Sequence, residues 1–342
     1  MATIQQVAAR AGVSTGTVSR YLNGAKIKES NRERIEEAVA ALGYHKNLLA
    51  GSLRSRKSRS VGLLVNNMLN HFATSAIAAI EREMELGNYI MLLAGFRNDP
   101  EVFEQKLELL LDRQVDGIIL FEGDAAWSPG QLVERSGLPV VSVSAPYESP
   151  CVDSVLADSR SSAKRVAAEM IRAGHKRLGV IAGPQHEHVS KERLDGVRAA
   201  VAEAGLPLEN LTVYLGDYSR ESGYAGLVDL VEGHGLDTVF CCNYGMGQGA
   251  LQAVAERGLV IGEDLNYASY DYFDLASLFY PRITTICPPT GVIGTFAASR
   301  LLELIDAGTT ASGAVTTFPD LITWQPSFTG IDPVLLGRSE EA

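Results

Sequence analysis

The chain has 342 residues, 46% of them hydrophobic and 21% charged, which is typical of a folded globular protein with more than one domain. No apolar run approaches the roughly 18 residues of a membrane-spanning helix, and the N-terminal residues lack the apolar core of a signal peptide. Four cysteines show neither zinc-binding nor redox spacing: Cys151, Cys241, Cys242 and Cys287. We therefore expect a cytoplasmic protein with reduced, buried thiols and no membrane association.

Charge is distributed unevenly along the chain. Residues 1–60 contain eleven Lys and Arg against four Glu, a formal charge of +7; because the whole chain carries -11, the remainder carries -18. A basic N-terminal segment on an acidic body indicates that this segment contacts a polyanion such as nucleic acid.

The first 46 residues are predicted to form three short helices. Thr3 and Gln6 have the spacing of a capping box at the start of the first helix, which Gly12 ends. A similar box from Ser30 is expected to open the third helix, which ends at Gly43. A tight turn between the first two helices predicts a helix-turn-helix bundle.

The second helix, over residues 15–23 and capped by Ser14, would carry the side chains that read DNA. Thr15, Thr17, Ser19 and Arg20 are expected to face outward, where hydroxyls and a guanidinium suit base edges and phosphates.

Several short stretches of this segment resemble the headpiece of the lactose-repressor (LacI/GalR) family: Thr3-Ile4, Val7-Ala8, Ala11-Gly12-Val13-Ser14, Thr17-Val18-Ser19-Arg20 and Leu22-Asn23. The resemblance implies sequence-specific binding to double-stranded DNA. It assigns DNA contacts in the headpiece to Thr3, Ser14, Thr15, Gly16, Thr17, Ser19, Arg20 and Asn23.

Residues 47–60 resemble the hinge of the same family, which folds into a helix on operator DNA. The resemblance implies DNA contacts from Ala50, Leu53 and Arg54, with Leu53 as the apolar wedge that unstacks a central base step. Gly51 stands where the family usually has Arg, and glycine inside a helix costs about 1 kcal/mol relative to alanine. The alternative is a solvated basic linker.

From residue 60 onward, short β-rich runs alternate with amphipathic helical segments such as 161–173 and 192–204. The predicted strands are 60–65, 89–93, 117–121, 140–143, 178–182, 211–215, 238–242, 266–270 and 282–286. Repeated βα units predict an α/β fold of parallel sheets covered by helices on both faces. The strands are too many for one comfortable sheet, so two lobes are expected, with a ligand cleft at the carboxyl ends of the strands.

The resemblance extends over essentially the whole chain and implies a periplasmic-binding-protein-like core. It suggests three segments: a headpiece at 1–46, a hinge at 47–60 and an effector-binding and dimerisation core at 61–342. One lobe would combine about 61–160 with 289–320, and the other about 161–288 with 321–342.

The resemblance assigns effector binding to Phe72, Arg193, Tyr218, Asn243 and Asp271. An arginine fork, a carboxylate, an amide and aromatic walls suit a sugar, although nucleobases use the same groups. Two structural alternatives stay open: Arg193 and Asp271 could form a salt bridge between lobes, and Phe72 and Tyr218 could be plain core.

Two further patterns point elsewhere. Gly245, Gly247 and Ala250 follow a predicted strand in the form G-x-G-x-x-A, with Asp271 placed like a ribose-binding acid, which alone would suggest an NAD(P)-dependent enzyme. His186-Glu187-His188 resembles a metal cluster, but no further ligand supports it and a solvated loop is expected.

The sequence therefore predicts a non-enzymatic, homodimeric transcriptional repressor of carbohydrate-use genes without a cofactor. It would bind a near-palindromic operator and respond to a sugar or sugar phosphate. Glu187 and Val189 differ from the residues of purine-responsive relatives, which favours a sugar. A corepressor-dependent regulator with a nucleobase-like effector is the alternative, and a solute-binding protein a more distant one.

Overall fold

The computed structural model describes residues 2–22, 24–44, 57–66, 68, 71–121, 135–147, 149–271 and 283–323. The chain forms two compact units, Met1–Ser58 and Arg59–Ala342. Within the described residues, no helix combines the length and apolar character needed to span a bilayer.

The N-terminal unit is a bundle of three helices, α1 (Ile4–Ala11), α2 (Thr15–Leu22) and α3 (Glu29–Leu42). Its small core consists of Val7, Ala8, Ala11, Val18, Ile35 and Ala38. The predicted capping box is confirmed, because the Gln6 amide donates to Thr3 Oγ1 (3.3 Å) and the Thr3 amide donates to Gln6 Oε1 (2.8 Å). Gly12 ends α1 with φ of 61°, a left-handed conformation that glycine adopts without strain.

The predicted start of α3 is wrong. The helix begins at Glu29 behind an N-cap at Lys28 that makes no side-chain hydrogen bond, so Ser30 lies inside the first turn. The acidic side chain of Glu29 interacts favourably with the positive end of the helix dipole. The helix can therefore begin before Ser30, the predicted hydroxyl cap. The predicted end at Gly43 is confirmed.

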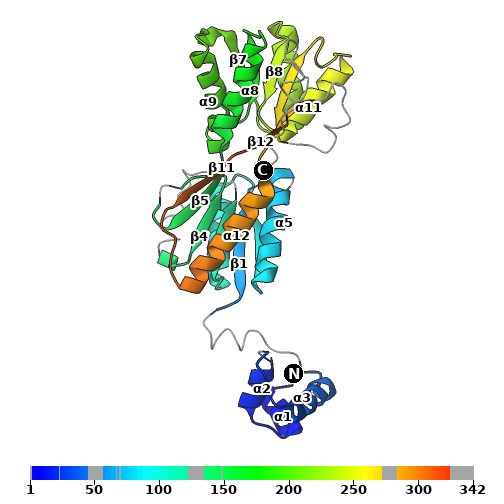
Figure 1. Ribbon diagram of the computed structural model, residues 1–342, viewed down its shortest axis with the longest axis vertical. Helices are drawn as coiled ribbons and strands as arrows, with labels where there is room; N and C mark the ends of the chain where they lie inside the picture. Colours follow the sequence, from blue (N-terminus) through cyan, green and yellow to red (C-terminus); the bar gives the residue numbers. More distant parts are fainter. Residues whose placement is uncertain are drawn as a thin grey trace. The chain divides into compact units, whose positions relative to one another are not determined.

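The larger unit contains two sheets, each of six strands among the described residues. The first has the order β11-β5-β4-β3-β1-β2, and all neighbouring strands are parallel (Figure 1). Its strands are β1 (Ser60–Val65), β2 (Ile90–Gly95), β3 (Gly117–Phe121), β4 (Val140–Val143), β5 (Val152–Ala157) and β11 (Val315–Phe318).

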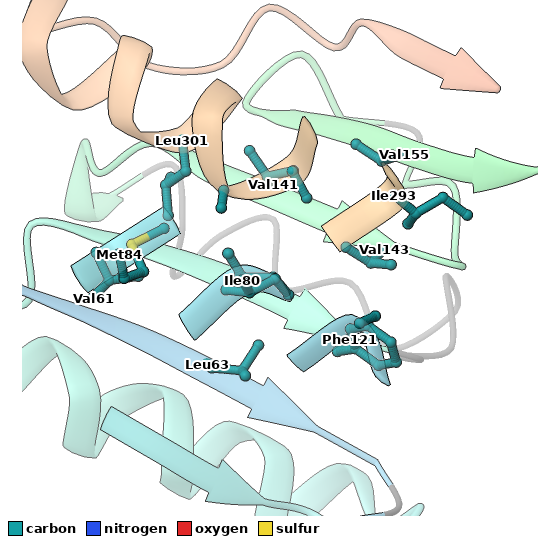
Figure 2. Close-up of a cluster of buried hydrophobic side chains, with 14 of the residues drawn as sticks. Val61, Leu63, Ile80, Met84, Phe121, Val141, Val143, Val155, Ile293 and Leu301 are labelled. Carbon is teal, nitrogen blue, oxygen red and sulfur yellow. The ribbon is translucent and has the colours of Figure 1, made fainter. Parts of the chain in front are cut away.

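Helices cover both faces of this first sheet, and together they form what we call the first lobe. On one face, α5 (His71–Leu86) and α12 (Thr290–Ala307) pack side by side over the strands, where Ile80, Met84, Ile293 and Leu301 meet the inward-facing valines (Figure 2). On the other face, α6 (Pro100–Asp112) buries Phe103, Leu107 and Leu110 and packs against β1 and β2.

The second sheet has the order β12-β10-β9-β8-β6-β7 and is parallel except for the β10–β12 pair. Its strands are β6 (Leu178–Ala182), β7 (Leu211–Leu215), β8 (Thr238–Cys241), β9 (Asn266–Tyr270), β10 (Thr284–Cys287) and β12 (Leu321–Thr323). With its helices it forms the second lobe. One face is covered by α8 (Ser159–Arg172) and α9 (His188–Glu203), the other by α10 (Arg220–Val228) and α11 (Tyr244–Glu256).

The expected α/β class is confirmed, and most predicted strands have the observed bounds. The strand predicted at 238–242 ends one residue early, the strands predicted at 89–93 and 282–286 differ at both ends, and β5, β11 and β12 were not predicted. In β5 the buried polar residues Asp153 and Ser154 interrupt the apolar run, while β11 and β12 are short edge strands whose side chains are mostly exposed. Edge strands lack the continuous apolar signal of a buried parallel strand.

The described chain passes between the two lobes at three places. It enters the second lobe from β5 through Asp158, returns from β10 to α12 through Pro288 and Pro289, and crosses again from β11 to β12 through Pro319 and Asp320.

Candidate functional site

The second helix of the N-terminal unit presents a polar, exposed surface. Thr15, Gly16 and Arg20 are exposed, whereas Val18 is fully buried against α1 and α3. Thr3 and Ser14 are also exposed, and the Ser14 hydroxyl accepts from the Thr17 amide (3.2 Å) as expected for a cap.

The expectation that Thr17 and Ser19 face fully outward is only partly met, because both are half-buried. The Thr17 hydroxyl lies 2.9 Å from Ser14 Oγ and shares a hydrogen bond with it. Thr17 thus completes the helix start, and Thr15 and Arg20 are the side chains most accessible to a partner. Asn23, Ala50, Gly51, Leu53 and Arg54 lie outside the described residues.

A cavity of about 490 Å³ lies between the two lobes of the larger unit. All five residues that the sequence indicated for effector binding line it: Phe72, Arg193, Tyr218, Asn243 and Asp271. Further lining residues come from both lobes and include Asn66, Ser144, Asp158, Ser159, Glu187, His188, Glu192, Arg220, Gln248 and Thr317.

The topology explains why distant residues meet here. Tyr218, Asn243 and Asp271 follow the carboxyl ends of β7, β8 and β9, and Arg193 lies in the helix that follows β6. Parallel strands with helical connections place these ends along one edge of the sheet, where ligands of open α/β folds bind. Phe72, at the start of α5, reaches the cavity from the first lobe.

Arg193 is one of two fully enclosed charged groups of the cavity wall, with 6% of its surface exposed against 5% for Asp271. Its Nη1 donates to the carbonyl oxygen of Cys242 (2.7 Å) and lies 3.7 Å from Asp271 Oδ2. Its guanidinium lies 3.6 Å from the centre of the Tyr270 ring, a cation–π contact. The Arg193–Asp271 ion pair exists, but both partners belong to the second lobe, so the alternative of a salt bridge between lobes is wrong.

Tyr270 connects this wall to the crossing segments. Its hydroxyl contacts the carbonyl oxygen of Ser159 (3.2 Å) and a carboxylate oxygen of Asp320, both on segments that pass between the lobes. Burial raises the pKa of Asp320 to about 6. Three buried polar atoms in this region have no hydrogen-bond partner among the described residues: Arg193 Nε, Ser159 Oγ and Asp320 Oδ1.

Only part of the Asn243 amide is available to a ligand. Its Oδ1 accepts from the amides of Gly245 (2.9 Å) and Met246 (3.3 Å) and so caps α11. The oxygen is committed to the helix, which leaves the NH2 group of the amide to serve a ligand.

The glycines of the G-x-G-x-x-A pattern have a packing role. A Cβ atom at Gly245 would lie 2.3 Å from the Tyr218 carbonyl oxygen, and one at Gly247 would lie 2.7 Å from Ser269 Oγ. The first-turn amides that would bind a pyrophosphate are capped by Asn243. The dinucleotide-binding interpretation is therefore wrong.

The two aromatic walls differ in character. Phe72 is 8% exposed and packs against Phe121 with ring centres 5.7 Å apart, so it is part of the core as well as of the cavity lining. Tyr218 is half-buried and has a left-handed backbone, with φ of 69°. Burial, and next the negative charge of Glu187, raise the pKa of Tyr218 well above its usual value, so its hydroxyl remains protonated.

The solvated-loop interpretation of 186–188 is wrong for two of the three residues. His186 is exposed, but Glu187 is the N-cap of α9, His188 is its first residue, and both line the cavity. Desolvation lowers the pKa of His188, so its imidazole is neutral at pH 7. Within the described part of the chain, no cluster of three or more His, Cys, Asp or Glu could hold a metal ion.

Sequence reasoning missed most of the polar lining residues. Asn66 and Ser144 directly follow β1 and β4, so the rule that sites form at carboxyl strand ends would have indicated them. Asp158 and Ser159 follow β5, a strand that was not predicted. The four cysteines are free thiols as expected; Cys241 and Cys242 are buried, while Cys151 and Cys287 are half-buried.

Comparisons with known proteins agree with this architecture. Residues 3–47 match the family of bacterial regulatory proteins of the lacI type, and residues 58–322 match the family of periplasmic binding proteins and sugar binding domains of the LacI family. The ribose operon repressor of Haemophilus influenzae is 32% identical over 307 residues, covering 89% of this chain and 92% of the relative.

Solved structures show the same fold. The lac repressor dimer bound to operator and the anti-inducer ONPF superposes with a TM-score of 0.83 at 24% identity, over 96% of this chain and 99% of that one. A complex of the transcriptional regulator CelR with cellobiose gives a TM-score of 0.71 at 26% identity, over 96% and 100%. The matched families span the helix-turn-helix unit and the two-lobed core, and the chain therefore belongs to the LacI family of DNA-binding transcriptional regulators.

Proposed function

We propose that this regulator is a cytoplasmic, homodimeric repressor of carbohydrate-use genes whose DNA affinity is controlled by a sugar-like effector in the cavity between the lobes. One observation carries the proposal: the five side chains that the family resemblance indicated, which lie in α5, in α9 and after β7, β8 and β9, line one cavity between two lobes. Buried polar atoms beside it, such as Arg193 Nε, lack partners among the described residues and favour a bound polar molecule.

The N-terminal unit, proposed to span residues 1–46, would bind the major groove through Thr15 and Arg20, supported by Thr3, Ser14, Gly16, Thr17, Ser19 and Asn23. Gly16 has no side chain on the exposed surface of α2, so direct reading of bases depends on Thr15 and Arg20. A guanidinium such as that of Arg20 pairs with the O6 and N7 atoms of guanine. A two-fold symmetric dimer would bind a near-palindromic operator.

The hinge, proposed to span residues 47–60, would contribute Ala50, Leu53 and Arg54, with Leu53 inserted between base pairs. An effector controls DNA binding only if it binds two arrangements of the core, proposed to span 61–342, with different affinities. The three segments that cross between the lobes are the places where such a change in lobe arrangement would occur.

The experiment that tests the proposal is selection of binding sites from random duplex DNA by the purified full chain at a stated salt concentration. Enrichment of one near-palindromic sequence is the expected result, and it would supply an operator for binding assays. If no sequence is enriched, with or without a pool of sugars and sugar phosphates, the proposal of a site-specific repressor is wrong.

A pair of variants separates the two sites. Leu53→Ala should abolish operator binding while effector binding is retained, whereas Arg193→Ala should abolish effector binding while operator binding is retained. Loss of both activities in Leu53→Ala would contradict the assigned roles. Nucleobases added to the same binding assay test the alternative effector class.

A further inference from the structure

We infer that the cavity selects uncharged, polyhydroxyl ligands and rejects their phosphorylated or carboxylated counterparts, with Glu187 and Glu192 as the specificity-determining residues. This inference rests on the proposed function, because it concerns the ligand of the same cavity.

The cavity wall has more negative than positive groups. Four carboxylates line it, from Asp158, Glu187, Glu192 and Asp271, against the two guanidinium groups of Arg193 and Arg220. His188, the remaining titratable imidazole of the lining, is neutral at pH 7 because desolvation lowers its pKa. The lining as a whole therefore carries two excess negative charges, and an anionic ligand would enter against them.

The charge of Arg193 is already balanced inside the protein. Its guanidinium lies 3.7 Å from Asp271, donates to the Cys242 carbonyl oxygen (2.7 Å) and stacks on the Tyr270 ring (3.6 Å). An anionic ligand beside this buried pair would be repelled by the Asp271 carboxylate as well as attracted by the guanidinium. Arg220 is exposed to solvent, where water and salt screen its attraction for a ligand.

Helix N-termini, which commonly bind phosphate, are mostly engaged here by the chain's own side chains. Asp158 Oδ1 accepts from an amide in the first turn of α8 (3.2 Å), and Ser219 Oγ does the same in α10 (3.0 Å). Asn243 Oδ1 accepts from two amides of α11 (2.9 and 3.3 Å). A phosphate at any of these three helix ends would have to displace an existing cap.

The N-terminus of α9 is different, because its N-cap residue, Glu187, makes no side-chain cap hydrogen bond. Two carboxylates flank this end: Glu187 itself, hydrogen-bonded to the Tyr218 hydroxyl, and Glu192 one turn further along the helix. Glu192 lies 3.7 Å from Arg160, but the side chain of that arginine is 53% exposed and compensates little. The two glutamates thus place negative charge beside the helix end that is otherwise best suited to bind an anion.

The same groups suit hydroxyls. A carboxylate only accepts hydrogen bonds, whereas a sugar hydroxyl both donates and accepts, so a polyol can donate to Glu187 and Glu192 and accept from the Asn243 NH2 group. A cavity of about 490 Å³ is within the range of small-molecule sites. Exclusion by like charges is a common source of ligand specificity.

The test is calorimetric titration of the full chain with matched ligands: D-ribose against D-ribose 5-phosphate, D-glucose against D-glucose 6-phosphate, and inorganic phosphate alone. In every pair that binds, the neutral sugar should bind at least about tenfold more tightly, since repulsion by like charges acts on the phosphorylated member only. Equal or tighter binding of the phosphorylated member would overturn the inference.

The variant Glu187→Gln/Glu192→Gln should reduce this ratio about tenfold and increase the affinity for phosphorylated ligands and phosphate. The matched control is Glu203→Gln, an exposed glutamate at the far end of α9, which should leave the ratio unchanged. An unchanged ratio in the folded double variant, or in each single variant, would remove the assigned role of the two glutamates.

Failure of the proposed function gives a different result. If the wild-type chain binds neither member of any pair, the proposal of a carbohydrate effector is wrong. The titration with inorganic phosphate then still decides whether the two glutamates exclude anions. Inorganic phosphate should bind the double variant and not the wild type. Phosphate binding by the wild type that is lost in Arg193→Ala would overturn the inference, as would a double variant that binds no phosphate.

Discussion

The guanidinium of Arg193 lies 3.6 Å from the centre of the Tyr270 ring, and the hydroxyl of the same tyrosine contacts Ser159 and Asp320. Arg193 and Ser159 both line the cavity, and Ser159 and Asp320 lie where the chain passes between the lobes. One buried tyrosine therefore connects a cavity-lining cation to two of the crossing segments. A ligand that displaces Arg193 would therefore change the contacts of the segments that connect the two lobes.

The stack between Arg193 and Tyr270 should contribute measurably to stability. In a double-mutant cycle of Arg193→Met and Tyr270→Leu, we expect a coupling free energy of about 1 to 2 kcal/mol, because the cation is desolvated and faces the ring. Urea unfolding of the wild type, both single variants and the double variant gives this value. Additive effects of the two substitutions would show that the ring only fills space.

Asp320 should make stability depend on pH. Burial raises its pKa from 3.8 to about 6, so between these values the native state holds a proton that the unfolded chain has released. This contribution is complete below pH 4, falls as the pH rises through 6 and is lost above it. Its full size is about 3 kcal/mol, from 1.36 kcal/mol per pKa unit.

The measurement is urea unfolding of the wild type and of Asp320→Asn between pH 4.5 and 7.5. Since the variant has no titrating group at this position, the stability of the wild type relative to the variant should decrease as the pH rises through 6. A constant difference between the two proteins over this range would show that Asp320 titrates normally in the folded state.

The packing of α10 against α11 should not tolerate a side chain at Gly249. A Cβ atom there would lie 1.8 Å from the Arg220 carbonyl oxygen, a backbone atom that cannot rotate away. We expect Gly249→Ala to lower the free energy of unfolding by about 3 kcal/mol or more, the range of severe overpacking. Because α10 carries Arg220 and α11, capped by Asn243, carries Gln248, the variant should also disturb the cavity.

The matched control is Gly291→Ala, near the start of α12. Apart from its chain neighbours and the backbone of its own helix, no described atom lies within 4 Å of a Cβ built at Gly291, so the alanine should be neutral or stabilise the helix by up to about 1 kcal/mol. Urea unfolding compares the two variants directly. Equal stability of both variants would refute the close backbone approach at Gly249.

The capping box at Thr3 should stabilise α1 locally. Thr3→Ala removes the acceptor for the Gln6 amide, and we expect the helix to lose about 1 kcal/mol, while Thr3→Ser should retain most of it. Hydrogen exchange of the α1 amides in the full chain measures this, with α3 as the internal reference. Faster exchange in both helices to the same extent would indicate that the loss is not local to the cap.

Much of the fold was predictable because it depends on local chemistry. The Thr3–Gln6 box and the helix ends at Gly12 and Gly43 depend on hydrogen bonds within a few residues. Most of the buried parallel strands are recognisable in the sequence as apolar runs. Where a local rule failed, as at Ser30, another local effect outweighed it. Strands such as β11 were missed because the partner strand, rather than their own side chains, specifies them.

The five cavity residues were predictable from the sequence as a set, but the contacts that each side chain makes were not. The sequence by itself, through its resemblance to a known family, indicated that an arginine, an aspartate, an amide and two aromatic residues would bind an effector in an α/β core. Only the tertiary structure decided that Asn243 uses its oxygen for a helix cap, that Arg193 pairs within one lobe and stacks on Tyr270, and that Glu187 lines the cavity. These relationships join residues far apart in the chain, and burial and distance, which govern hydrogen bonds and charge interactions, exist only once the lobes have folded.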